Sequence, residues 1–140
     1  MSRPQSFVLV NTIHGPLIVN RLDYHVNRLG ETYGVGSQLF QYGEYEVEEV
    51  KNIKNFLTSL HDARGGGVVA LDIGANIGVH TVEMAKHMYE WGEVIAFEPQ
   101  LPLYHCLCGN VVLALFRFSI FKFWSTMVVS WLSVISSGLD

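Results

Sequence analysis

The sequence predicts an α/β fold built around a parallel β-sheet. Two short apolar runs, at residues 68–71 and 94–97, have the composition of buried strands, and residues with helical spacing lie between them. A glycine-containing segment, residues 72–78, joins the first run to that helix. Strand, loop, helix and strand in this order make a βαβ unit, in which the two strands are parallel and the crossover is right-handed.

Composition places the chain among globular proteins. Its 140 residues are 49% hydrophobic and 16% charged, which is enough apolar content for one core and excludes a disordered chain. The formal net charge is −4, and the nine basic residues are scattered. Because nucleic-acid binders carry clustered Lys and Arg, we expect no nucleic-acid partner.

The cysteines and the N-terminal residues indicate a reducing environment. Cys106 and Cys108 are poorly spaced to bridge each other in regular structure, and no second pair of ligands lies at zinc spacing. We therefore predict no metal site and expect both cysteines to be small buried side chains. The first residues are polar and show no signal peptide, so we expect a cytoplasmic location.

Residues 1–43 are predicted to form a small N-terminal cap that contains a β-hairpin. Val, Ile and Leu are frequent in residues 7–13 and 17–19, and Gly and Pro between these segments provide a turn. Residues 20–43 mix glycines, polar residues and aromatic residues without a clean period. Gly34 and Gly36 indicate a loop there.

Residues 44–113 are predicted to form the core domain, which begins with an amphipathic helix. Apolar side chains recur at helical spacing, and glutamates near residue 44 favour a helix N-terminus, until three glycines at residues 65–67 end the helix. The apolar run that follows is expected to be a strand buried on both faces. Helical spacing returns at residues 77–88 and at residues 103–111, on either side of the second strand.

The ends of the two strands carry the candidate binding residues. Asp72 follows the first strand and Glu98 the second, and ligands of open α/β sheets bind at this edge. Gly74 and Gly78 permit a tight turn that brings the N-terminus of the next helix to the same edge. Glu98 lies 24 residues after Gly74, the spacing of an acid that accepts hydrogen bonds from ribose hydroxyls. An adenosine-containing ligand is therefore predicted.

The loop sequence favours a ligand without a pyrophosphate. A dinucleotide-binding loop needs glycines where this chain has Asn76 and Val79, and the sequence contains no P-loop motif. S-adenosylmethionine fits better, with its ammonium and carboxylate groups meeting Asp72 and the loop amides.

Three of the polar side chains have a structural interpretation as well as a functional one. Asp72 can cap the following helix, a role that is compatible with ligand binding. Glu98 can be an exposed acid in a loop before a proline. His80 is a candidate general base for a hydroxyl acceptor, but a partly exposed helix residue is the simpler interpretation, so the catalytic residue is left unassigned.

Three stretches of sequence together carry a family resemblance. They are Tyr-Gly-Glu-Tyr-Glu at 42–46, Val-Ala-Leu-Asp-Ile-Gly-Ala-Asn-Ile-Gly at 69–78, and Val-Ile-Ala-Phe-Glu-Pro at 94–99. With this pattern, residues 40–113 resemble the FkbM-type family of class I S-adenosylmethionine-dependent methyltransferases.

The resemblance implies a seven-stranded Rossmann-like sheet and methyl transfer, usually to a hydroxyl oxygen. The acceptor is then expected to be a hydroxyl group of a small molecule or a glycan. The resemblance also implies that Glu98 holds the ribose of the cofactor. By the same resemblance, the cofactor loop is formed by Asp72, Gly74, Ala75, Asn76 and Gly78.

Residues 114–140 depart from the family pattern and form a divergent apolar tail. Alternation at residues 116–120 permits a third strand. Residues 123–139 are uncharged but short and rather polar for a membrane span, so a membrane partner is not expected. We expect the chain to be a truncated or frameshifted form of a longer methyltransferase, with an incomplete sheet whose open edge permits self-association.

Two alternatives to an active methyltransferase stay open at this point. One is a non-catalytic fragment that binds a nucleoside or pairs with another chain. The other is a protein anchored in a membrane by its apolar tail.

Overall fold

A computed structural model of the chain describes residues 5–115 and 123–126. Strands β1 (Phe7–Thr12) and β2 (Gly15–Asn20) pair as an antiparallel hairpin, with Leu9 opposite Ile18. The predicted N-terminal hairpin is therefore confirmed. Its turn contains Gly15 with a left-handed φ of 100°, a conformation that glycine adopts without steric cost.

The segment after the hairpin is more regular than its sequence indicates. Two very short strands, β3 (His25–Val26) and β4 (Thr32–Tyr33), pair with each other, and helix α1 (Val35–Tyr42) follows. The expected loop at Gly36 is therefore wrong, because this glycine lies inside α1. A side chain at Gly36 would collide with the carbonyl oxygen of Asn20, so the glycine permits close packing of α1 on the hairpin.

Helix α2 (Val47–Arg64) is the amphipathic helix that the sequence predicts, although it begins three residues later than Glu44. It ends at Gly65, which adopts a left-handed φ of 63° and donates its N–H to the carbonyl of His61 at 2.9 Å. A left-handed glycine that satisfies a carbonyl of the last turn is a common helix terminator.

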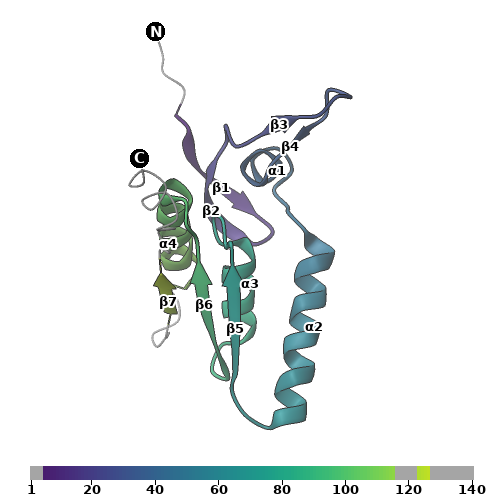
Figure 1. The fold of residues 1–140 in the computed structure, drawn as a ribbon, viewed down its shortest axis with the longest axis vertical. Helices are drawn as coiled ribbons and strands as arrows, with labels where there is room; N and C mark the ends of the chain where they lie inside the picture. Colours follow the sequence, from purple (N-terminus) through teal and green to yellow (C-terminus); the bar gives the residue numbers. More distant parts are fainter. Residues whose placement is uncertain (1–4, 116–122, 127–140) are drawn as a thin grey trace, which may run out of the picture.

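The βαβ unit is present as predicted. Strand β5 (Val68–Ile73) pairs in parallel with β6 (Gly92–Phe97), and helix α3 (Val79–His87) connects them. Helix α4 (Leu101–Leu115) follows β6. Figure 1 shows the hairpin β1–β2 beyond the carboxyl ends of β5 and β6, the edge where the sequence places the binding residues.

A third strand, β7 (Phe123–Thr126), pairs in parallel with β6, so the described sheet has the order β5-β6-β7. The strand expected at residues 116–120 lies outside the described residues. Within the described part of the chain, no helix is long and apolar enough to cross a membrane. The first four residues of the apolar segment 123–139 form β7, and the others are not among the residues that the structure describes.

Strand β5 is buried on one face only, which corrects the expectation of burial on both. Val68 and Ala70 point into the core, whereas Val69 and Leu71 are 57% and 59% exposed and Ile73 is 79% exposed. Helices α2 and α3 contact β5, and no described helix covers the face that carries Val69. The sequence pattern alone did not reveal this because both faces carry aliphatic residues.

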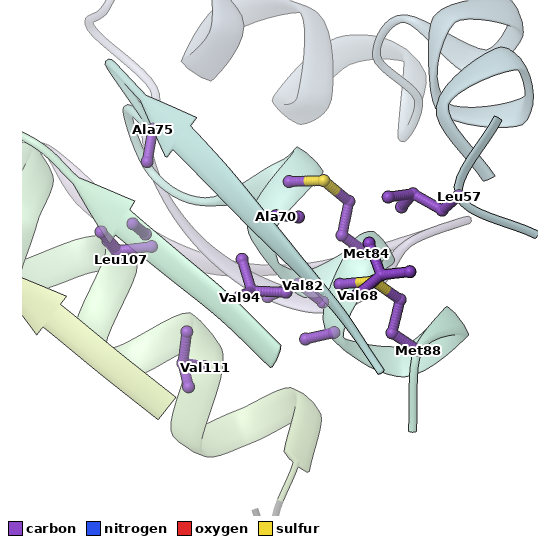
Figure 2. Close-up of a cluster of buried hydrophobic side chains, with 12 residues drawn as sticks. Leu57, Val68, Ala70, Ala75, Val82, Met84, Met88, Val94, Leu107 and Val111 are labelled. Atoms are coloured by element: carbon purple, nitrogen blue, oxygen red, sulfur yellow. The ribbon is translucent and has the colours of Figure 1, made fainter. Parts of the chain in front are cut away.

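Two hydrophobic clusters hold these elements together. The larger one lies between the sheet and its helices and contains Met84 and Met88 of the segment around α3 (Figure 2). The smaller one joins Leu17 and Val19 of the hairpin to Ile77 in the loop after β5. It also contains Cys106, which is buried as expected, whereas Cys108 is half-buried. The hairpin and the loop therefore share one core.

Candidate functional site

The loop between β5 and α3 has left-handed backbone at every second residue. Gly74, Asn76 and Gly78 have φ values of 85°, 53° and 91°. Asparagine is among the few residues with a side chain that adopt this conformation readily. Gly78 is needed for a second reason, because an added Cβ would lie 2.5 Å from Cδ1 of Leu107. The glycine thus lets α4 pack directly on the start of α3.

Every backbone N–H of this loop, residues 74–78, already has an acceptor within the protein. Two donate to a carbonyl of β6, one to a carboxylate, and two to groups of the loop itself. The bonds are Gly74 and Ala75 to the Phe97 carbonyl (2.9 and 3.0 Å), Asn76 to Glu98 Oε2 (2.8 Å), Ile77 to Asn76 Oδ1 (2.7 Å) and Gly78 to the Ala75 carbonyl (2.8 Å). The amides of residues 74–78 are therefore already paired within the protein, whereas dinucleotide loops offer unpaired amides to the diphosphate.

Glu98 lies directly after β6 and is only 3% exposed, so the interpretation as an exposed loop acid is wrong. Its Oε2 accepts the N–H of Asn76, and its Oε1 accepts the N–H of Gln100 at 2.7 Å. The carboxylate therefore ties the end of β6 to the neighbouring loop. These are two hydrogen bonds from described residues, and an ionised carboxylate accepts about four.

Asp72 lies within β5, opposite Ala96 in the parallel register, and accepts a hydrogen bond from the hydroxyl of Thr81. The alternative that Asp72 caps α3 is wrong, because the N-cap position is Gly78 and no side chain caps it. Asp72 instead fixes α3 to the strand from which the loop leaves. Glu98 and Asp72 thus hold the loop from its two sides.

A cavity of about 190 Å³ opens beside the loop, between it and the junction of α1 with α2. Its lining residues are Val35, Tyr45, Glu46, Gly74, Ala75, Asn76, Ile77, Val79 and His80. Three predicted site residues, Gly74, Ala75 and Asn76, therefore lie on its wall, whereas Asp72, Gly78 and Glu98 do not. Pockets for whole small ligands measure roughly 300–1,000 Å³, so this cavity suits one end of a larger molecule.

Tyr45, Glu46 and His80 form a polar cluster in this cavity. Glu46 has a left-handed backbone, with φ and ψ of 47°. Its Oε2 lies 3.2 Å from Nε2 of His80, and the rings of Tyr45 and His80 are 6.5 Å apart. Burial, a hydrogen bond with Glu46 and the charge of Glu46 raise the pKa of Tyr45 to about 12. The tyrosine is therefore a neutral hydrogen-bonding group at physiological pH.

Sequence reasoning missed Tyr45 and Glu46 as candidate site residues. Both lie in the segment 42–46 that carries part of the family resemblance, and Glu46 was interpreted as one of the glutamates of a solvated helix N-terminus, so neither was assigned to binding. His80 is half-buried, in agreement with the simpler of its two predicted roles. A left-handed glutamate has no distinct sequence signal, so only the backbone shows where its side chain lies.

Asn110 of α4 was also missed, and it connects the loop to the N-terminal hairpin. Its side chain is fully buried. Its Oδ1 accepts the N–H of Ile18 at 2.5 Å, and its Nδ2 donates to the carbonyls of Ile18 and Ile77 at 3.0 and 2.8 Å. A lone amide in an apolar helix segment is the sequence signal that points to such a role, because buried polar groups require partners.

A buried ionic cluster fixes the hairpin turn to the helices. Glu83 of α3 contacts Lys54 of α2, lies 3.4 Å from His14 of the hairpin and 3.8 Å from Lys86. Burial alone would raise the pKa of Glu83, but hydrogen bonds from His14 and Lys54 and the two lysine charges lower it to about 2. Burial in turn lowers the pKa of Lys86, which donates a hydrogen bond to the carbonyl of His14.

Comparisons with known proteins find similarity among solved structures only. No protein-family model and no curated protein matches the chain. Among solved structures, the chain is similar to a "putative O-methyltransferase from Klebsiella pneumoniae" with a TM-score of 0.42 and 19% sequence identity. The match covers 71% of this chain and 41% of that one, so this chain spans about two fifths of its length. The resemblance to the FkbM-type family stays a prediction, as does the division at residues 43 and 113.

Proposed function

We propose that the chain binds S-adenosylmethionine at the carboxyl edge of β5 and β6 and serves methyl transfer to a hydroxyl oxygen of a small molecule or glycan. The observation that carries the proposal is the pairing of the loop amides. All five N–H groups of residues 74–78 are bonded within the protein, and the acid at the end of the next strand is buried beside them.

This pairing discriminates between adenosine-containing ligands. NAD and ATP carry phosphates that need unpaired amides or a lysine near the loop. S-adenosylmethionine has no phosphate and needs acceptors for its ribose hydroxyls and its ammonium group. Glu98 accepts two hydrogen bonds from described residues and, as an ionised carboxylate, is able to accept about two more at the edge where ligands of α/β sheets bind, which suits the ribose. The resemblance of residues 40–113 to FkbM-type methyltransferases supports the same ligand.

The contribution of this chain to the chemistry is positioning. When bound, S-adenosylmethionine supplies a methyl group attached to a positively charged sulfur. The loop and Glu98 hold the nucleoside, so that an acceptor oxygen is able to approach the methyl carbon in line with the breaking bond. Proximity and alignment of this kind supply much of the rate enhancement in group transfer. The residue that takes the hydroxyl proton is not assigned.

Calorimetric titration of the purified chain tests the proposal. We expect S-adenosylmethionine to bind and NAD not to bind. Glu98→Ala should weaken binding by about 1.5–3 kcal/mol, roughly 10- to 150-fold, because it removes charge-assisted hydrogen bonds to the ribose. Glu49→Ala, in the exposed first turn of α2, is the matched control and should leave the affinity unchanged.

Three results would contradict the proposal. They are no binding of S-adenosylmethionine, preferential binding of NAD, or an equal effect of the Glu98 and Glu49 substitutions. The first would favour the alternative of a non-catalytic interaction fragment.

A further inference from the structure

His14, in the turn between β1 and β2, connects the hairpin to the junction of α1 with α2. The residue is buried, with only 3% exposed. On one side its Nδ1 lies 3.4 Å from Oε1 of Glu83, and on the other side its Nε2 accepts the backbone N–H of Tyr45 at 3.3 Å. The ring therefore bridges α3 and the segment that leads into α2.

The hydrogen-bond network assigns the protonation state of this ring. Nε2 accepts a hydrogen bond, so it carries no proton, and the single proton of the neutral ring is then on Nδ1, which faces the Glu83 carboxylate. A second proton would make Nε2 a donor that faces another donor, the N–H of Tyr45. The hydrogen bond from Tyr45 therefore requires a neutral His14, whereas the contact with Glu83 is compatible with both states.

Charges of both signs surround the ring. The Glu83 carboxylate favours a second proton on His14, whereas the ammonium groups of Lys54 and Lys86, which approach the same carboxylate, oppose it. Lys86 also donates a hydrogen bond to the carbonyl of His14. Glu83, with a pKa lowered to about 2, and Tyr45, with a pKa that burial above all raises to about 12, keep their charge between pH 5 and 8. Histidine is the side chain that ordinarily changes charge in this range.

The segment that contains Tyr45 needs contacts that hold it. Glu46, the next residue, has a left-handed φ of 47°, a conformation that costs free energy for residues other than glycine and persists only where neighbouring contacts offset the cost. A second hydrogen bond, from the N–H of Ile13 to the carbonyl of Gly43 at 2.9 Å, joins the same segment to the hairpin turn. Because Tyr45 and Glu46 line the cavity beside the glycine loop, these contacts also fix the cavity wall.

We propose that His14 is a pH-sensitive contact of the fold: its neutral ring holds the junction of α1 with α2 against the hairpin, and protonation of Nε2 releases Tyr45 and the cavity wall that it forms. The inference does not depend on which ligand the cavity takes. His80 also faces this wall, with its Nε2 3.2 Å from Oε2 of Glu46. Protonation of His80 would strengthen that ion pair and hold the wall more firmly, so its effect has the opposite sign.

Hydrogen–deuterium exchange of the Tyr45 amide, followed by NMR, tests the inference. We expect its protection factor, corrected for the intrinsic exchange rate at each pH, to be about 3- to 10-fold lower at about pH 5 than at about pH 7.5, because one hydrogen bond is lost. The amide of Val82, which donates to the carbonyl of Gly78 at 2.9 Å, is the internal control and should keep its protection.

Two variants and a control assign the effect to one ring. His14→Gln offers an amide oxygen that accepts a hydrogen bond at either pH, and His14→Phe offers no acceptor. In both variants the protection of the Tyr45 amide should differ by less than about twofold between the two pH values. His25→Gln removes a histidine from an exposed position of β3 and should leave the pH effect of the wild-type chain unchanged.

A measurement on the wild-type chain completes the test without any variant. The ring-nitrogen chemical shifts of His14 should change over the same pH range as the protection of the Tyr45 amide. The inference is overturned if the protection of Tyr45 is equal at both pH values, if it falls as much in the His14 variants, or if it falls while the ring of His14 keeps one protonation state. A loss of protection at Val82 as large as that at Tyr45 would also overturn it, since the whole fold would then be opening.

Discussion

Replacing Asn110 with alanine tests whether one side chain holds the hairpin to the glycine loop. The substitution removes three hydrogen bonds and leaves the N–H of Ile18 and the carbonyls of Ile18 and Ile77 without their partner. A buried group left unsatisfied costs about 1–3 kcal/mol, and water compensates partly at Ile18, which is half-buried. We therefore expect the free energy of unfolding to fall by about 2–4 kcal/mol.

Urea unfolding followed by circular dichroism measures this loss, with the slope of the transition showing whether the folded state stays compact. Asn52→Ala makes the same change at an exposed position of α2 and should cost less than about 0.5 kcal/mol. Asn110→Leu fills the volume but makes no hydrogen bond, so it should be destabilised as well. If Asn110→Ala loses no more stability than Asn52→Ala, the amide does not hold the hairpin.

The remaining predictions concern the loop and the ionic cluster. Gly78→Ala should destabilise the fold by about 2–4 kcal/mol, because the added Cβ would sit on a residue with a left-handed φ of 91° and would lie 2.5 Å from Leu107. A melting temperature equal to that of wild type would refute this prediction. Glu83 has a folded-state pKa of about 2 against 4.5 as its ordinary value, so its stabilising contribution, about 3 kcal/mol, is present above pH 4.5 and is lost as the pH falls toward 2. In urea unfolding at pH 6 and pH 2.5, the difference in the free energy of unfolding between wild type and Glu83→Gln should thus be smaller at pH 2.5. A difference that does not depend on pH would contradict the lowered pKa of Glu83.

The βαβ unit was predictable because each of its signals is local. The apolar run at residues 68–71, the glycines of the loop and the acid after β6 all lie in one short stretch, and short-range rules relate them to strand, turn and helix. Helix α1 was not predictable in this way. It has only eight residues and is flanked by Gly34 and Gly43, so packing of Leu39, which is 1% exposed, stabilises it more than its own sequence does.

The candidate site was only partly predictable for a similar reason. The residues of the loop were found because they are contiguous in sequence. Glu46 and His80, by contrast, are brought together by the docking of α2 on α3, and Asn110 acts on residues 92 positions away in the hairpin. Contacts of such long range have no period or motif, and only the packed chain reveals them.

The side-chain amide of Asn110 makes the hydrogen bonds to β2 that a further strand would make at its outer edge. The N–H and carbonyl of Ile18 point away from β1, and an outer edge of this kind is a template on which other chains polymerise. Asn110 bonds both the N–H and the carbonyl of Ile18 in the middle of this edge, so these two groups are not available to pair with a strand of another chain. The same amide donates to the carbonyl of Ile77, so a strand that displaced Asn110 from Ile18 would also disturb the glycine loop. One side chain thus covers part of a strand edge and holds the glycine loop.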